Sequence, residues 1–491
     1  MKTFSRRKFL TQATNSLAVA GVTSLLPQSA WSQPKGANDL IRVAVVGVGW
    51  KGGQHVEEFS KISGVQVAAL CDADLDRANE AATKLREAHQ KVTVYQDYRK
   101  LLEDKDIDAV VIATPNHWHA LMTIWACQAG KDVYVEKPVS HSIWEGQRML
   151  GAEKKYGRII QAGTQNRSNP EFDRGTEYLS EGHIGAIKGI HGIYYKFRES
   201  IGKVRGPQKI PASVDFDLYQ GPAPMTGLNR TKLHYDWHWQ WQTGSGEMGN
   251  LAAHTTDDVR RMMGDGRQPN RVRSIGGRFL YNDDGETANQ HLAILDYGDF
   301  PVFVETRNLP HKTGLKQMDH IKNSRQGNIV YCEGGYLTMG RGGATVYSKE
   351  GKRIKTWQSD AGKGHTSNFI EAVRNQNRKL LNCPLEIGVK AGELFHQANL
   401  SHRSGFPASP KEIESLFAGT EVGEAAWSTL QSNFQLNGID LEKDPLTLGS
   451  WMSLEKKGTR LNVHDSDSEL VAQSLFAPRN YRRPFVVSEK V

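Results

Sequence analysis

Three glycines follow an apolar run near the start of the chain. The run from Ile41 to Val46 leads directly into Gly47, Gly49 and Gly52, which have the spacing G-x-G-x-x-G. In a strand-to-helix turn these glycines permit a tight turn, close approach of the backbone to a pyrophosphate, and close packing of helix on strand. The N-terminus of the following helix would hold the phosphate charge. The spacing therefore predicts a dinucleotide-binding turn, with Trp50 beside the bound cofactor.

An acidic residue follows at the distance that such a turn requires. A second apolar run, Val65 to Cys71, ends in Asp72, about twenty residues after Gly52. A carboxylate there binds the ribose hydroxyls of NAD and repels the 2′-phosphate of NADP. No lysine or arginine follows Asp72 until Arg77. We therefore expect NAD rather than NADP.

A lysine is fixed at the end of a later strand. The run from Asp132 to Val135 is followed by Glu136-Lys137-Pro138. Proline restricts the residue before it to extended conformations, so the strand ends here. Ligands bind beyond the carboxyl ends of parallel strands, where Lys137 could hydrogen-bond a substrate hydroxyl. The alternative is a solvated surface lysine, the more common environment for this residue.

A histidine and an asparagine share one face of a predicted helix. The segment from Asn250 to Met263 has a helical pattern, and Gly264 would end it. Asn250 and His254 are one turn apart. Histidine is the usual general base near neutral pH, although a lone helical histidine is often structural.

Three tryptophans occupy every second position in a segment shortly before this helix. Trp237, Trp239 and Trp241 predict a strand with one face made of indole rings. Such a face packs in a core or stacks on a sugar ring. We take Trp237, His238 and Trp239 as candidate substrate contacts, with core packing as the alternative.

Two domains must position these side chains. Strands and helices alternate from Leu40 to about Ala162, which predicts a parallel, doubly wound Rossmann sheet over residues 38–162. Alternating apolar runs then predict a large, mainly antiparallel open sheet in an α+β domain over residues 163–404. The expected fold class is α/β, and the extension over residues 405–491 has no assigned role.

Composition excludes several other classes of protein. The net charge is +8, but four positive charges lie in residues 1–33, which contain no acid, so 8 − 4 = +4 remains. This is too little to indicate a nucleic-acid partner. The four cysteines have no metal-type spacing, and we expect Cys71 and Cys127 to be buried free thiols. No apolar span after the leader is long enough for a transmembrane helix, so neither a metal nor a membrane anchor is expected.

The N-terminus has the features of an export signal. Ser5 to Leu10 reads S-R-R-K-F-L, a mildly apolar run from Leu17 to Leu26 follows, and Ala30-Trp31-Ser32 offers a cleavage site. This order predicts a twin-arginine (Tat) signal over residues 1–32 and a periplasmic or secreted protein. The alternative is a disordered basic tail.

Taken together, these motifs resemble the Gfo/Idh/MocA oxidoreductases, which include glucose-fructose oxidoreductase and inositol dehydrogenase. The resemblance covers roughly residues 40–405. It rests on the glycine-rich turn, T-P-N-H-W-H at Thr114 to His119, Glu136-Lys137-Pro138, G-T-Q-N-R at Gly163 to Arg167, and the segment from Gly249 to Asp257.

The resemblance implies hydride exchange between NAD(P) and a carbohydrate carbon, and a C-terminal sheet that often forms a homo-oligomer interface. It implies that Lys137 hydrogen-bonds the reacting hydroxyl and that His254 is the acid/base. The implied cofactor-pocket residues are Thr114, Pro115, Asn116, His119, Glu136, Lys137 and Gln165, with Asn166 and Arg167 toward the substrate. Many relatives have aspartate where this chain has Asn250, which can orient a hydroxyl but cannot accept its proton.

The expected function is that of an exported NAD-dependent oxidoreductase acting on a carbohydrate hydroxyl. Because we expect no NAD pool outside the cytoplasm, the nicotinamide would stay tightly bound and the cycle would be redox-neutral. One alternative is an NAD-dependent glycoside hydrolase that works by oxidation, elimination, hydration and reduction, since it needs the same residues. A second alternative is a non-catalytic, cofactor-bound sugar sensor.

Overall fold

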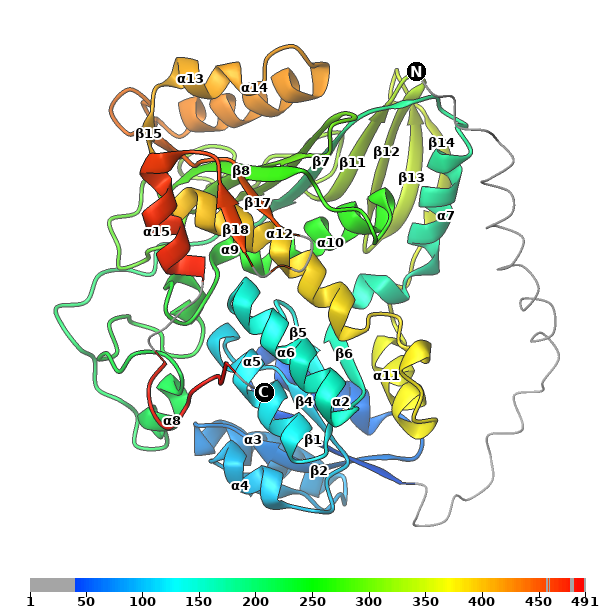
Figure 1. The fold of residues 1–491 in the computed structure, drawn as a ribbon, viewed down its shortest axis with the longest axis vertical. Coiled ribbons are helices and arrows are strands. Elements are labelled where there is room, and N and C mark those ends of the chain that lie inside the picture. Colours follow the sequence, from blue (N-terminus) through cyan, green and yellow to red (C-terminus); the bar gives the residue numbers. More distant parts are fainter. Residues whose placement is uncertain (1–39, 456–457, 459, 477–480, 490–491) are drawn as a thin grey trace. The chain divides into compact units, whose positions relative to one another are not determined.

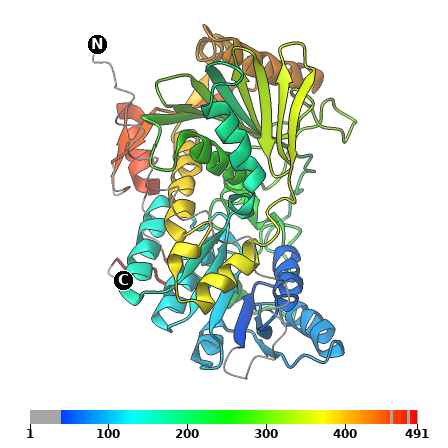
Figure 2. The same ribbon diagram turned by 90° about the vertical axis from the view of Figure 1, so that its right-hand side faces the viewer.

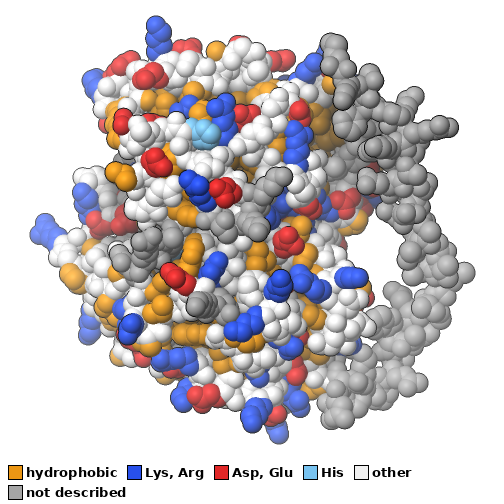
Figure 3. Space-filling model, in the orientation of Figure 1, with side chains coloured by type: hydrophobic (Ala, Val, Ile, Leu, Met, Phe, Trp, Pro, Cys, Tyr) orange, Lys and Arg blue, Asp and Glu red, His pale blue; other side chains and the backbone are white. Residues whose placement is uncertain are grey.

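The computed structural model describes residues 40–455, 458, 460–476 and 481–489. The predicted twin-arginine leader lies outside the described residues. Within them, no helix is long and apolar enough to cross a membrane. All four cysteines are buried and free, as predicted for Cys71 and Cys127. On the face drawn in Figure 3, basic and acidic side chains are interspersed.

Six parallel strands form the first sheet, in the order β3-β2-β1-β4-β5-β6 (Figure 1). The strands are β1 (Ile41–Val46), β2 (Val65–Cys71), β3 (Thr93–Tyr95), β4 (Ala109–Ile112), β5 (Asp132–Glu136) and β6 (Ile160–Gly163). The connecting helices are α2 (Trp50–Ser60), α3 (Leu75–Glu87), α4 (Tyr98–Glu103), α5 (Asn116–Gln128) and α6 (Ile143–Tyr156). This order confirms the predicted Rossmann sheet. It places the turns after β1 and β4 side by side where the strand order reverses, which is where such sheets bind ligands.

Twelve strands form the second sheet, in the order β14-β13-β12-β11-β7-β10-β9-β8-β16-β15, with β17 paired to β8 and β18 paired to β17. The strands are β7 (Ile187–Tyr195), β8 (Arg271–Gly277), β9 (Gln290–Asp296), β10 (Pro301–Arg307), β11 (Gln326–Cys332), β12 (Gly335–Gly340), β13 (Gly343–Ser348), β14 (Arg353–Gln358), β15 (Phe406–Ala408), β16 (Leu446–Leu448), β17 (Met452–Leu454) and β18 (Leu461–Val463). Only β7 and β10 pair in parallel among these described strands. The predicted mainly antiparallel sheet is confirmed.

The chain after the second sheet returns to the first domain. Helix α11 (His365–Arg374) contacts α2, and its Phe369 is buried in one core with Phe59 and Tyr134. Helix α12 (Leu385–Arg403) contacts α6 and β6 of the Rossmann half as well as β8 and α10 (Ala252–Met263). The sequence-based boundary placed residues 163–404 in one domain, whereas the apolar face of α11 is buried against the Rossmann core.

The C-terminal extension builds part of the second domain. Its β15 and β16 lengthen the large sheet, and helix α14 (Glu421–Leu436) contacts β7 and β10 (Figures 1 and 2). Phe417, Trp427 and Phe434 share a buried core with Leu292 and Phe303 of the sheet. Helix α13 (Pro410–Ser415) precedes α14, and α15 (Ser466–Phe476) contacts α12. The extension therefore covers one face of the central strands. Formation of a homo-oligomer through this sheet stays a prediction.

One local prediction in the second domain is wrong, and one predicted helix begins two residues later than expected, at Ala252 instead of Asn250. The tryptophan segment is not a strand, because Asp236–Trp239 forms the short 3-10 helix η4. The chain folds back so that Gly244 packs directly on η4: a Cβ on Gly244 would lie 2.3 Å from the Cα of His238. This close approach fixes the conformation of the tryptophan segment. The predicted helix from Asn250 is interrupted at Leu251, so α9 (Gly246–Asn250) ends before α10 begins.

The packing of α14 predicts that the extension is needed for stability. Phe434 is 1% exposed, and Phe434→Ala should lower the free energy of unfolding by about 3–5 kcal/mol, as removal of a buried aromatic ring does. Leu470→Ala on α15 is the control, because Leu470 is 83% exposed and its loss should change stability by less than about 0.5 kcal/mol. Urea unfolding of both variants measures this, and equal midpoints would contradict the assignment.

Candidate active site

The turn after β1 accepts only glycine at two positions. Gly47 has φ +79°, and a Cβ there would lie 2.8–2.9 Å from the backbone of Ala113 and Thr114. A Cβ on Gly52 would lie 1.8 Å from the carbonyl oxygen of Gly47. Gly49 precedes α2, and no side chain caps that helix. The turn thus packs tightly against β4 and leaves the start of α2 for a phosphate.

Asp72 lies at the end of β2 beside this turn. Its carboxylate accepts hydrogen bonds from the backbone N–H groups of Val48 (2.9 Å) and Asp74 (3.0 Å). Arg77, which the sequence analysis placed too far along the chain to matter, comes close: its Nη1 lies 3.2 Å from where a Cβ on Gly49 would be. Trp50, at the first position of α2, is 77% exposed. The end of β2 therefore brings together Asp72, the Arg77 guanidinium and a second acid, the buried Asp74, whose Oδ2 lies 3.9 Å from Arg77 Nε.

The loop after β4 is held by a buried histidine. Pro115 precedes α5, and Asn116, its first residue, is 4% exposed. The ring of His119 lies between two carbonyl oxygens, with Nδ1 2.7 Å from that of Pro138 and Nε2 2.8 Å from that of Thr114. At 1% exposure, His119 ties the loops after β4 and β5 together instead of lining a pocket, which corrects the expectation that it contacts cofactor.

Glu136 is a buried anion at the end of β5. Its Oε1 accepts hydrogen bonds from His55 Nε2 (2.8 Å) and Gln165 Nε2 (2.8 Å), and Lys51 Nζ is 3.7 Å away. Burial opposes ionisation, but the His55 hydrogen bond and the Lys51 charge hold the pKa of Glu136 well below its usual range. Glu136 therefore stays charged and orders this end of the sheet.

Asn166 and Arg167 are not placed for substrate contact. Asn166 Nδ2 donates to Asp258 Oδ1 (2.6 Å), and the Arg167 guanidinium forms hydrogen bonds of 2.7 Å to both oxygens of Asp257. Arg167 also pairs with Asp265 at 2.7 Å. Both residues attach the segment after β6 to α10, because buried charges of this kind need paired partners.

Lys137 and Asn250 are brought together, as expected of two catalytic candidates. Lys137 Nζ donates to the backbone carbonyl of Asn250 (2.7 Å) and to its Oδ1 (3.0 Å). Burial lowers the pKa of Lys137 to about 8, with the charges of Glu136 and Glu247 acting in the opposite direction. The amine is therefore close to half protonated near pH 8, which suits proton transfer.

His254 is adjacent to this lysine and is neutral. Burial, together with the charges of Lys137 and Arg341, lowers the pKa of His254 well below its ordinary value. Its Nδ1 is buried and has no hydrogen-bond partner among the described residues. The ring of Tyr194 lies 6.3 Å from the imidazole.

Glu247 is the residue that sequence reasoning missed. It is 1% exposed, accepts a hydrogen bond from Asn250 Nδ2 (Oε2, 3.0 Å), and pairs with Arg198 Nε (Oε1, 2.6 Å). Burial opposes ionisation, but Arg198 and His238 lower the pKa of Glu247 to about 2. Its spacing of three residues before Asn250 was the available signal. Many relatives have an aspartate where this chain has Asn250. In this chain the nearby carboxylate is that of Glu247, three residues earlier.

The tryptophans near this set divide between core and surface. Trp239 is 2% exposed and lies under the Arg278 guanidinium at 4.7 Å, so it packs in the interior. Trp237 is partly buried, and its carbonyl accepts a hydrogen bond from Thr243 Oγ1 (2.7 Å). His238 is 3% exposed, with Nε2 3.5 Å from Glu247 Oε1. The indole platform predicted for sugar stacking is therefore not formed. Among the described residues, no cluster of His, Cys, Asp and Glu could hold a metal ion.

Glu247→Gln should move the pH dependence of turnover to lower pH. The change removes a negative charge that favours protonated Lys137, so the pKa of Lys137 should fall further below its ordinary value. If neutral Lys137 is the base, the rise in kcat with increasing pH should then begin at lower pH. Glu199→Gln, an exposed glutamate beside Arg198, is the control and should leave the profile unchanged. An unshifted profile in Glu247→Gln would exclude this coupling.

The ribose pocket predicts tighter binding of NAD than of NADP. Asp72→Ala should remove the repulsion of a 2′-phosphate and leave Arg77 to bind it, so the preference should narrow or reverse. Asp76→Ala, an exposed acid on the first turn of α3, should keep the wild-type preference. Dissociation constants for both dinucleotides test this, and tighter binding of NADP by the wild type would refute it.

Known proteins match the chain in two stretches. Residues 41–164 match the oxidoreductase family described as NAD-binding Rossmann fold, and residues 182–278 match the C-terminal alpha/beta domain of that family. Inositol 2-dehydrogenase of Salmonella typhimurium is 32% identical over 173 residues, which are 35% of this chain and 50% of that protein. Glycosyl hydrolase family 109 protein 1 of a Shewanella species is 41% identical over 122 residues, 24% of this chain and 27% of that protein.

Solved structures share the fold. Levoglucosan dehydrogenase in complex with NADH and levoglucosan superposes with a TM-score of 0.53 at 18% identity, over 73% of this chain and 95% of that one. A putative oxidoreductase from Magnetospirillum magnetotacticum gives a TM-score of 0.52 at 18% identity, over 73% and 99%. The curated relatives are matched over half their length or less. Residues 41–164 and 182–278 are thus similar to the two domains of the Gfo/Idh/MocA oxidoreductases, and the first of them has an NAD-binding Rossmann fold.

Proposed function

We propose that the protein is an exported NAD-dependent oxidoreductase that acts on a carbohydrate hydroxyl. The observation that carries the proposal is the position of Lys137. Its amine, with a pKa lowered to about 8, lies at the carboxyl end of β5 and is held by Asn250 beside the Glu247 carboxylate. A proton-transfer group at the ligand-binding edge of a dinucleotide-binding sheet is what oxidation of a hydroxyl requires.

The described residues fit NAD at this edge. The turn at Gly47 to Gly52 approaches β4 too closely for any side chain, and α2 begins without a side-chain cap. Asp72 would hold the adenosine ribose. NAD, when bound, supplies the hydride acceptor, and the protein positions it.

This chain's own residues would move the hydroxyl proton. Neutral Lys137 would accept it, and the nearby charges of Glu136 and Glu247 favour the protonated form that results. The family resemblance implies that His254 accepts the proton. Burial beside Lys137 and Arg341 disfavours an imidazolium there, so neutral His254 is better suited to orient a hydroxyl. The proposed division of labour therefore reverses the one implied by the resemblance.

The twin-arginine motif supports export of a folded, NAD-loaded protein. Outside the cytoplasm a released NADH would not be replaced, so the hydride must return to a second carbonyl compound or to the same sugar. The nicotinamide would remain bound throughout the cycle. Each tenfold gain in retention requires about 1.4 kcal/mol from the pocket.

A glycoside hydrolase is the second candidate. The 41% identity to a glycosyl hydrolase family 109 protein over 122 residues favours it. Oxidation, elimination, hydration and reduction would use the same base and the same bound NAD. A sugar sensor without turnover, the third candidate, would not need a lysine with a lowered pKa.

The exported form should retain NAD through purification without added nucleotide. Denaturation should release about one NAD per chain, and the native protein should turn over sugars or aryl glycosides without net change in nicotinamide absorbance. Lys137→Ala should keep the NAD and lose about 10²–10⁴-fold in rate, the usual contribution of a general base.

Release of the aryl group from an aryl glycoside would identify the hydrolase, and oxidation of the sugar coupled to reduction of a carbonyl compound would identify the oxidoreductase. A cofactor-free protein that consumes one added NAD per product would contradict the redox-neutral cycle. Retained NAD with no turnover would favour the sensor.

A further inference from the structure

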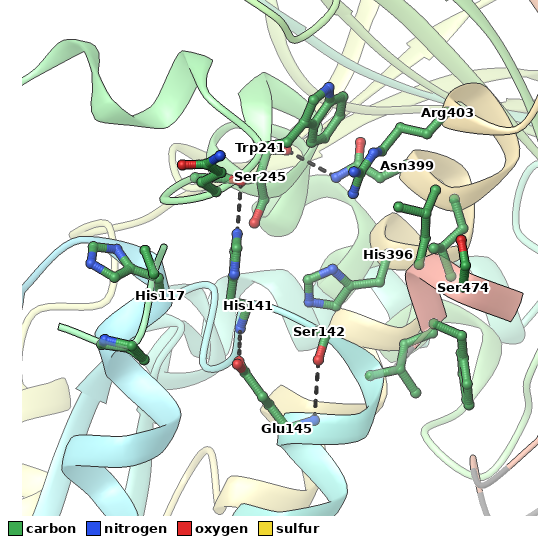
Figure 4. A pocket seen from close by; sticks show the side chains of 18 of the residues that line it. His117, His141, Ser142, Glu145, Trp241, Ser245, His396, Asn399, Arg403 and Ser474 are labelled. Atoms are coloured by element: carbon green, nitrogen blue, oxygen red, sulfur yellow. Dashed lines mark hydrogen bonds between the residues drawn. The ribbon is translucent and has the colours of Figure 1, made fainter. Parts of the chain in front are cut away.

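A cavity of about 300 Å³ lies outside the set formed by Lys137, Asn250 and His254 (Figure 4). Its walls come from the start of α6, from α12, from the turn at residues 241–245, and from α15 in the C-terminal extension. None of the three catalytic candidates lines it. This volume lies at the small end of the range for ligand sites.

Two polar atoms are buried at one wall of the cavity. Ser245 Oγ and Asn399 Oδ1 have no hydrogen-bond partner among the described residues. Both residues are buried, with 2% of Ser245 and 6% of Asn399 exposed. The two residues are already joined, because Asn399 Nδ2 donates to the carbonyl of Ser245 (2.9 Å). A buried polar atom without a partner costs about 1–3 kcal/mol, so a ligand or water is expected to satisfy it.

A neutral histidine extends this wall. Burial lowers the pKa of His396 to about 3, and its Nε2 lies 3.2 Å from the carbonyl oxygen of Ser140. Because a carbonyl can only accept, the proton is on Nε2 and Nδ1 is an acceptor. Glu145, also on the wall, has its pKa raised by burial to about 7. Both oxygens of Glu145 already accept hydrogen bonds, from the backbone N–H of His141 (2.8 Å) and the hydroxyl of Tyr481 (2.9 Å). Ser245 Oγ, Asn399 Oδ1 and His396 Nδ1 therefore remain as the acceptors beside the cavity.

The opposite side of the cavity is apolar. Ile143 and Leu400 lie on α6 and α12, and Leu475 and Phe476 come from α15. Trp241 also lines the cavity, and the guanidinium of Arg403 lies 4.6 Å from its ring. Figure 4 shows Trp241 and Arg403 together at one end, and Ser142 and Glu145 at the other. Because Leu475 and Phe476 belong to α15, the C-terminal extension supplies part of this cavity.

These features select among ligand classes. An apolar ligand would leave Ser245 Oγ and Asn399 Oδ1 unsatisfied. An anion would be attracted by Arg403 at one end of the cavity but would meet the acceptors Asn399 Oδ1 and His396 Nδ1 and the Glu145 carboxyl elsewhere. Hydroxyl groups both donate and accept, and the carbon face of a sugar ring packs on apolar and aromatic side chains.

We propose that this cavity is a second binding site, separate from the catalytic set, for a neutral polyhydroxylated molecule the size of a monosaccharide. One continuous segment connects this site to the catalytic set. Gly244 and Ser245 line the cavity and immediately precede α9, which carries Glu247 and Asn250. His141 Nε2 donates to the carbonyl of Gly244 (3.0 Å) and fixes this turn from the Rossmann side. Occupancy would thus order the segment that holds Lys137.

The test uses the purified, NAD-loaded protein with D-glucose, D-galactose and myo-inositol as probes. Calorimetric titration should detect binding of at least one probe, and a crystal soaked with it should place the probe in the cavity, beside Ser245 and Asn399. Ser245→Ala removes no hydrogen bond within the described residues, so it should leave the unfolding midpoint unchanged or raised. It should weaken binding about three- to tenfold, the effect of losing one neutral hydrogen bond.

Two further variants make the outcome decisive. Leu475→Trp should fill the cavity and abolish this binding. Leu470→Ala is the control on the same helix, because Leu470 is 83% exposed and does not line the cavity. Lys137→Ala should keep binding at the cavity, which separates this proposal from the proposed function. Ordered water alone in the soaked crystals, or equal affinities for Ser245→Ala and the wild type, would overturn it.

Discussion

The contact between Lys137 and Asn250 joins the two domains at the point where chemistry would occur. Lys137 directly follows the fifth strand of the Rossmann sheet, and Asn250 ends α9 of the second domain. The lysine donates to both oxygens of Asn250, and the asparagine amide donates to Glu247. A buried ammonium is tolerated only with such partners. The orientation of α9 and the protonation of Lys137 therefore depend on each other.

Two carboxylates set the charge of this lysine from opposite sides. Glu136 is the adjacent residue on β5, held ionised by His55 and Lys51, and Glu247 comes from α9, held ionised by Arg198. Both carboxylates raise the pKa of Lys137, but burial has the larger effect and lowers that pKa to about 8. The outcome is a lysine poised near the pH at which proteins work, a property that usually marks a functional site.

The C-terminal extension gives this chain features that its two matched domains do not account for. Helix α14 covers central strands of the large sheet through Phe417, Trp427 and Phe434. Helix α15 closes a cavity whose other walls include the turn before α9. Residues far apart in sequence are thus connected to the segment that holds Lys137, and a ligand in that cavity would act on the catalytic set through this turn.

The sequence by itself determined the first domain and the position of Lys137 at the end of its fifth strand. G-x-G-x-x-G, Asp72 and Glu136-Lys137-Pro138 are local patterns, because one turn, one strand end and one proline impose the geometry. What lies across from Lys137 was decided only by tertiary structure. Glu247 and Arg77 reach the site because separate elements pack together, whereas Trp239 and Arg167 are buried by the same packing. Burial also decided protonation, since desolvation keeps His254 neutral and no local pattern encodes it.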